Sequence, residues 1–148
     1  MTALNINMGK KPVRVAIVPC NGEELCEGTV TRFATRKVLE ELRPGQTVTM
    51  CMPLFTVGDE KQRTFTHRIA TVTLDGCDKK CCTTSAAQQQ GRPIHPLVVS
   101  EILARQGAKL SGDPQHLSAA DHKLVDLVAE EVAAKVDSII AEIHQKEN

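Results

Sequence analysis

The sequence VRVAIV, residues 13–18, is an apolar and β-branched run that only Arg14 interrupts. Such a run predicts a buried β-strand, because β-branched side chains pack well on the pleated surface of a sheet. The turn-forming residues PCNG, residues 19–22, follow at once and end the strand. A buried strand this early in the chain indicates a fold built around a central sheet.

Helices and strands alternate in the sequence that follows this strand. The apolar spacing predicts helices over residues 29–42, 58–67 and 79–90 and strands over residues 47–51 and 69–74. Residues 96–103 fit either a strand, which the apolar residues 97–99 favour, or a helix that Pro96 opens. This alternation predicts an α/β fold: a small three-layer sandwich with a mostly parallel sheet of about four strands.

A long helix is expected to end the chain. Ser118 followed by Asp121 matches a helix-capping pattern, and an apolar stripe runs on through residues 124–143. A helix over residues 118–145 would be about 40 Å long, which exceeds what a small sheet covers. Its end is therefore either a contact in a homodimer or a frayed terminus.

Composition limits the classes of partner. The 148 residues fit one domain, residues 1–148, in which the polar residues 1–11 form a flexible N-terminus. The 18 basic and 18 acidic side chains balance, and aromatic residues make up 2% of the chain, so a nucleic-acid partner is not expected. Residues 1–11 carry no apolar signal core, and no apolar run reaches the roughly 18 residues that span a bilayer, which predicts a cytoplasmic protein with no membrane partner.

Six cysteines are the chemically distinctive residues of the chain. In a reducing compartment, clustered cysteines more often bind metal or carry out redox chemistry than form disulfides. Cys20, Cys51 and Cys77 each lie at or just past the end of a predicted strand, with gaps of 31 and 26 residues that suit one strand–helix–strand unit each. If the strands are parallel, all three cysteines lie at the carboxyl edge of the sheet, where open α/β sheets bind ligands.

Cys81 is expected to join these three cysteines. It follows Cys77 by four residues, a spacing that on a helix start returns the second thiol to the side of the first. The N-terminal dipole of that helix would favour thiolates, and four thiolates suit a tetrahedral zinc ion. The sequence therefore predicts a metal site formed by Cys20, Cys51, Cys77 and Cys81.

Two cysteines and the histidines are left outside this site. Cys26, expected in the loop after the first strand, is a candidate substitute ligand. Cys82 neighbours Cys81, but consecutive helical residues diverge by about 100°, so we expect a buried packing thiol there. His67 and His95 lie nearest the predicted site, and the absence of a paired ligand in sequence favours surface or hydrogen-bonded roles for them.

The ordered set of Cys20, Cys51, Asp75-Gly76-Cys77 and Cys81 resembles the DGC-domain family. This family comprises small prokaryotic proteins, named for a central Asp-Gly-Cys motif, that are described as zinc-binding through four cysteines. The resemblance covers about residues 13–110 and implies ligand roles for Cys20, Cys51, Cys77 and Cys81. It implies no known reaction, and Cys26 and Cys82 are additional to the family's four cysteines.

Three functions remain open at this point. A closed shell of four thiolates favours a structural, carrier or sensing zinc site over an enzyme that activates water. The alternative is a thiol-redox or sulfur-transfer enzyme, with Cys20 and Cys26 or Cys77 and Cys81 as the exchanging pair. An iron–sulfur cluster would use the same four cysteines. Phosphoryl transfer is disfavoured, because the arginine that a phosphatase loop needs six residues after its cysteine is replaced by Cys26.

Overall fold

Four parallel strands form the centre of the computed structural model, which describes residues 12–89 and 93–148. The strands are β1 (Val15–Pro19), β2 (Thr47–Thr49), β3 (Thr71–Asp75) and β4 (Ile94–Val98). They lie in the order β2-β1-β3-β4, and each neighbouring pair is parallel. The predicted parallel sheet of about four strands is confirmed, whereas the expected flexible segment, residues 1–11, lies outside the described residues.

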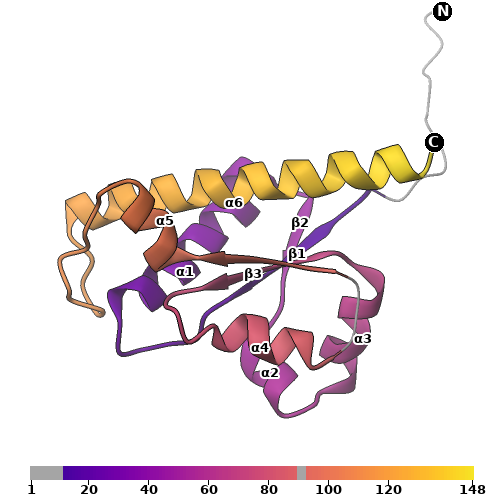
Figure 1. Ribbon diagram of the computed structural model, residues 1–148, viewed down its shortest axis with the longest axis horizontal. Helices are drawn as coiled ribbons and strands as arrows, with labels where there is room; N and C mark the ends of the chain where they lie inside the picture. The colour runs from indigo at the N-terminus through magenta and orange to yellow at the C-terminus, as the bar shows by residue number, and fades with distance from the viewer. Residues whose placement is uncertain (1–11, 90–92) are drawn as a thin grey trace, which may run out of the picture.

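Helices cover both faces of this sheet (Figure 1). One face carries α1 (Cys26–Lys37), its π-helical continuation η1 (Val38–Leu42), α5 (Val99–Arg105) and α6 (Ala119–Lys146). The opposite face carries α2 (Met52–Thr56), α3 (Glu60–Arg68) and α4 (Cys81–Ala87). The predicted three-layer α/β sandwich is therefore confirmed.

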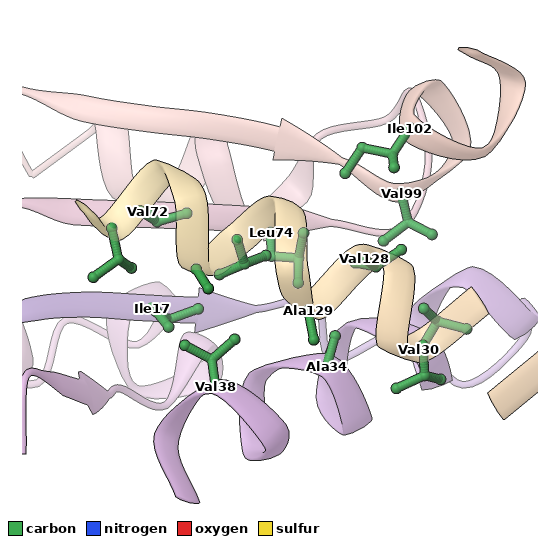
Figure 2. Packing of buried hydrophobic residues seen from close by; sticks show 14 of the residues in the cluster. Ile17, Val30, Ala34, Val38, Val72, Leu74, Val99, Ile102, Val128 and Ala129 are labelled. Carbon is green, nitrogen blue, oxygen red and sulfur yellow. The ribbon is translucent and has the colours of Figure 1, made fainter. Parts of the chain in front are cut away.

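The alternation of side chains along β1 divides the core into two clusters. Val15 and Ile17 belong to the larger cluster, which α1, α5 and α6 complete on one face of the sheet (Figure 2). Ala16 and Val18 point to the other face, where they pack with Phe55 of α2 and with other buried side chains. Burying one such aliphatic side chain stabilises the fold by about 1.5–3 kcal/mol, so both clusters hold the sheet between its helices.

Helix α6 follows the predicted long C-terminal helix closely. Ser118 and Asp121 form the expected capping box. Asp121 is buried and also accepts hydrogen bonds from the backbone and hydroxyl groups of Ser111, which hold the pKa of its carboxyl well below the usual range. The apolar stripe of α6 packs on the core of its own chain through Val125, Val128, Val132, Val136 and Ile139. A dimer contact at the end of this helix stays a prediction.

Several predicted boundaries are corrected by the structure. Helix α1 begins at Cys26 rather than at residue 29, so Cys26 belongs to a helix and not to a loop. Residues 52–56 form α2, in which Pro53 occupies the first turn, where a missing N–H costs no hydrogen bond. Residues 96–103 combine both alternatives: β4 ends at Val98 and α5 follows at once. Pro96 is tolerated in β4 because β4 lies at the edge of the sheet.

Candidate metal centre

The carboxyl edge of the sheet brings three strand ends together. Cys20 directly follows β1, while Cys51 and Cys77 lie two residues past the ends of β2 and β3. Because β1 lies between β2 and β3 and all three strands are parallel, Cys20 occupies the middle of this edge. The Cys20 N–H also donates to the Leu74 carbonyl at 2.9 Å, which extends the β1–β3 pairing by one residue. The predicted placement of the three cysteines at one edge is confirmed.

A pocket of about 360 Å³ opens at this edge beside Cys20. Cys77 and Cys81 line it together with Cys20, and the remaining wall comes from Gly22, Glu23, Glu24, Leu25, Gly28, Gly76 and Lys79. Three of the four predicted ligands therefore share one pocket. The fourth, Cys51, is exposed at the start of α2 and does not line this pocket.

The spacing of Cys77 and Cys81 has a different origin from the helical turn that we expected. Helix α4 begins at Cys81, and Cys77 lies in the preceding turn, where its carbonyl accepts from the Lys80 N–H at 3.2 Å. Lys80 adopts a left-handed conformation with φ of 52°, which is uncommon for a residue with a side chain. This turn, and not an i,i+4 helical pair, brings both thiols to the same pocket.

The sulfur of Cys20 is surrounded by hydrogen-bond donors. The backbone N–H of Gly22 donates to Cys20 Sγ at 3.2 Å. The Cys82 hydrogen bond is the largest cause that lowers the pKa of Cys20, and the backbones of Gly22 and Gly76 add to it against the opposing effect of burial. The pKa of Cys20 falls to about 6, so this thiol is ionised at neutral pH.

Cys82 is fully buried, as predicted for a packing thiol, and contacts the cluster that contains Val18, Met50 and Phe55. Its hydrogen bond to Cys20 and its burial raise the pKa of the Cys82 thiol. Cys82 therefore stays protonated and acts as the donor of the pair. The sequence did not predict the effect of Cys82 on Cys20, because the expectation for Cys82 concerned only whether it could ligate the same ion as Cys81.

Asp75 fixes the start of α4 from the end of β3. Its buried carboxylate accepts from the backbone N–H of Cys82 at 2.7 Å, from the N–H of Thr83 at 3.2 Å and from the Thr83 hydroxyl. These bonds satisfy helix N–H groups that have no partner within the helix. The sequence signal for this contact is an aspartate at the end of a strand shortly before a helix.

The backbone packs tightly where the loop after β1 meets α1. A Cβ atom added to Gly28 would lie 2.6 Å from the Gly22 carbonyl oxygen, and one added to Gly76 would lie 2.9 Å from the Gly28 nitrogen. The Arg32 guanidinium donates to the same Gly22 carbonyl at 2.7 Å and so braces the loop. Close approach of three glycine backbones is thus what positions Cys20 and Cys77.

Gly28→Ala should test this packing. The added methyl group must displace the Gly22 backbone, so we expect a loss of about 1–3 kcal/mol in the free energy of unfolding and a higher pKa for Cys20. Urea denaturation and thiol alkylation at several pH values measure the two effects. Gly45→Ala is the control: Gly45 has φ of 76° and no atom within 4 Å of an added Cβ, so it costs stability through strain alone. Equal effects of both variants on the Cys20 pKa would contradict this account.

Cys26 and the histidines do not line the Cys20 pocket. The Cys26 thiol is buried and donates to the Asp113 carbonyl at 2.9 Å, and it lines a separate pocket beside α5. His95 lies in β4 and lines a pocket with Ala70 and Pro93, which precede their strands at the opposite edge of the sheet. Burial lowers the pKa of His95. His67 lies in the last turn of α3.

The donor set fits a zinc ion in its chemistry, since it offers soft thiolates, one of them already ionised at neutral pH. All six cysteines are free thiols. Within residues 12–89 and 93–148, no group of three or more His, Cys, Asp or Glu side chains is already arranged to hold a metal ion. An ion at this edge would therefore require the Cys77, Cys81 and Cys51 side chains to turn toward Cys20.

The family model described as the DGC domain matches residues 16–136, which include all six cysteines. No curated protein and no solved structure matches the chain. Within the described ranges, the helices are all too short or too polar to cross a lipid bilayer.

Proposed function

The chain belongs to the DGC-domain family, and from this premise we propose that it binds one zinc ion at the carboxyl edge of the sheet. The observation that carries the proposal is the common pocket of Cys20, Cys77 and Cys81. Cys20 supplies the first thiolate, because its donors keep it ionised at neutral pH. Cys51 is the fourth ligand in this proposal. It follows the strand next to β1, and because it is exposed, its side chain can turn toward Cys20 without disturbing the core.

The surroundings favour reversible binding over a purely structural ion. Structural zinc sites typically supply folding energy to small domains that lack a core. Here two hydrophobic clusters hold the sheet and its helices, and of the three cysteines that line the pocket only Cys20 packs against one of these clusters. Cys51 and Cys81 are exposed, so an ion could be exchanged with a partner thiol. A carrier or sensing role in a reducing, cytoplasmic compartment therefore suits the site better than hydrolysis.

The zinc affinities of the Cys77→Ser and Cys26→Ser variants should distinguish a cysteine that ligates the ion from one that does not. Elemental analysis of the purified wild-type protein is expected to give one zinc ion per chain. Cys77→Ser should lower the zinc affinity by more than about 100-fold, since even the loss of an outer-shell partner costs 10- to 100-fold. Cys26→Ser is the matched control, because Cys26 is a cysteine of the same chain that lies outside the pocket.

Competition with a chromophoric chelator measures both affinities. Wild-type affinity in Cys26→Ser, together with a large loss in Cys77→Ser, supports the proposal. Bound iron with visible charge-transfer absorption would replace the zinc proposal with an iron–sulfur cluster on the same cysteines. A protein purified under reducing conditions with neither metal, and unable to take up zinc, would rule out both.

A further inference from the structure

Gly22 lies directly against the Cys20 sulfur. Its backbone N–H donates to Cys20 Sγ at 3.2 Å, and a Cβ atom added to Gly22 would also lie 3.2 Å from this sulfur. A glycine therefore lets the loop after β1 approach the thiol without crowding it. Residues 20–25 form neither a helix nor a strand, so the position of Gly22 depends on contacts from outside this loop.

The side chain of Arg32 on α1 supplies such a contact. Its Nη1 donates to the Gly22 carbonyl at 2.7 Å and to the Gly28 carbonyl, in the first turn of α1, at 3.3 Å. Its Nη2 lies 3.4 Å from the Thr29 hydroxyl and 3.8 Å from the Glu23 carboxylate. One guanidinium thus joins the loop after β1 to the start of α1.

The position and chemistry of Arg32 suit this role. Arg32 follows Gly28 by four residues, so the two lie on the same face of α1, and the side chain points back toward the start of the helix. The Arg32 side chain is 33% exposed, so its hydrogen bonds are partly shielded from water. A guanidinium carries five donors in a rigid fork, whereas the donors of a lysine share one flexible nitrogen.

We propose that Arg32 is a positioning residue for the Cys20 ligand: it fixes Gly22, and Gly22 orients the Cys20 sulfur toward the pocket. The proposal rests on the proposed zinc-binding function. Groups that orient a metal ligand without touching the ion typically change the metal affinity by 10- to 100-fold when they are mutated. Arg32 acts on Cys20 through Gly22, so its effect should lie at the lower end of this range.

The backbone of Cys20 is held independently of Arg32. The Cys20 N–H donates to the Leu74 carbonyl at 2.9 Å, and the buried Thr31 hydroxyl donates to the Cys20 carbonyl at 3.2 Å. Loss of the guanidinium should therefore release Gly22 while β1 and α1 stay in place. A merely structural role for Arg32 predicts the opposite result, which is lower stability without a change in the zinc affinity of the folded protein.

The test uses the full chain, reduced and freed of metal with a chelator. Arg32→Met keeps the apolar stem and removes every donor, and we expect it to lower the zinc affinity about tenfold in competition with a chromophoric chelator. In the metal-free protein, NMR should show faster solvent exchange of the Gly22 amide in this variant, with unchanged exchange of the Val72 amide in β3. Arg36→Met is the matched control, because Arg36 lies one turn further along α1 and pairs with exposed Glu40.

Each outcome decides a separate point. Wild-type zinc affinity in folded Arg32→Met, an equal loss in Arg36→Met, or unchanged exchange of the Gly22 amide would overturn the proposal. Circular dichroism establishes that each variant is folded, and Arg32→Lys replaces Arg32→Met if that variant unfolds. If the wild-type protein takes up no zinc, the proposed function fails, and the exchange of the Gly22 amide still decides whether Arg32 holds Gly22 against the Cys20 sulfur.

Discussion

Replacement of Asp75 by alanine is expected to cost about 3 kcal/mol or more of stability and to abolish high-affinity zinc binding. The buried carboxylate accepts from two backbone N–H groups and one hydroxyl at the start of α4. Hydrogen bonds to a charged group contribute about 1.5–3 kcal/mol each, and the N–H groups left buried add their own desolvation cost. Urea denaturation with zinc-free protein measures the stability, and chelator competition measures the zinc affinity.

Asp78→Ala is the matched control, because Asp78 is an exposed aspartate in the same segment, next to Cys77. We expect its stability to stay within about 0.5 kcal/mol of the wild type, as for most surface substitutions. Asp75→Asn should fall between the two variants, since one acceptor oxygen remains without the charge. If Asp75→Ala were as stable as Asp78→Ala, the carboxylate could not be what holds α4 in place.

Each residue of the Asp-Gly-Cys motif has a separate physical role in the structure. Asp75 caps α4 and so positions Cys81 and Cys82. Gly76 lets the backbone pass the Gly28 nitrogen, where an added Cβ would lie at 2.9 Å. Cys77 contributes its thiol to the pocket. Two of the three motif residues thus build the site and the third supplies chemistry, which explains why the tripeptide alone says little about ligands.

The arrangement of the sheet could be predicted because it depends on regular features of the sequence. Strand–helix–strand units of similar length connect parallel strands, so the spacing of Cys20, Cys51 and Cys77 was enough to place them at one edge. Boundaries were less predictable where local and tertiary preferences compete. Pro53 lies in the first turn of α2, which begins at Met52, and β4 accepts Pro96 because it lies at the edge of the sheet.

The positions of the buried residues Cys82 and Asp75 behind the pocket could not be predicted from spacing. The orientation of Cys82 depends on where α4 begins, and that depends on the left-handed Lys80 and on the Asp75 carboxylate. Neither effect leaves a periodic pattern in the sequence, because each depends on one residue: the positive φ of Lys80 and the buried side chain of Asp75. The position of Cys26 could not be predicted from spacing either. Because α1 begins about one turn earlier than expected, Cys26 lies in this helix and not in the loop after β1, and its thiol donates to the Asp113 carbonyl.

In metal-free protein, the reactivity of Cys20 should follow a pH profile with its midpoint near pH 6, in contrast to about 8.5 for a free cysteine. At pH 7 about nine-tenths of Cys20 would be thiolate against about 3% of an unperturbed thiol, a difference of roughly thirtyfold. Because its pKa is lower in the folded state than in the unfolded state, Cys20 stabilises the fold above about pH 8.5, and this contribution is lost as the pH falls toward 6.

The midpoint depends first on the Cys82 thiol, so Cys82→Ala should move the profile to higher pH, while Cys26→Ala should leave it unchanged. The rate of iodoacetamide labelling at Cys20, followed by mass spectrometry between pH 5 and pH 9, gives the midpoint without relying on the absolute rate. This matters because intrinsic nucleophilicity falls as the pKa falls. A midpoint that stays near 6 in Cys82→Ala would show that the backbone N–H groups alone hold the thiolate. A wild-type midpoint near 8.5 would remove the ionised Cys20 on which the proposed metal site depends.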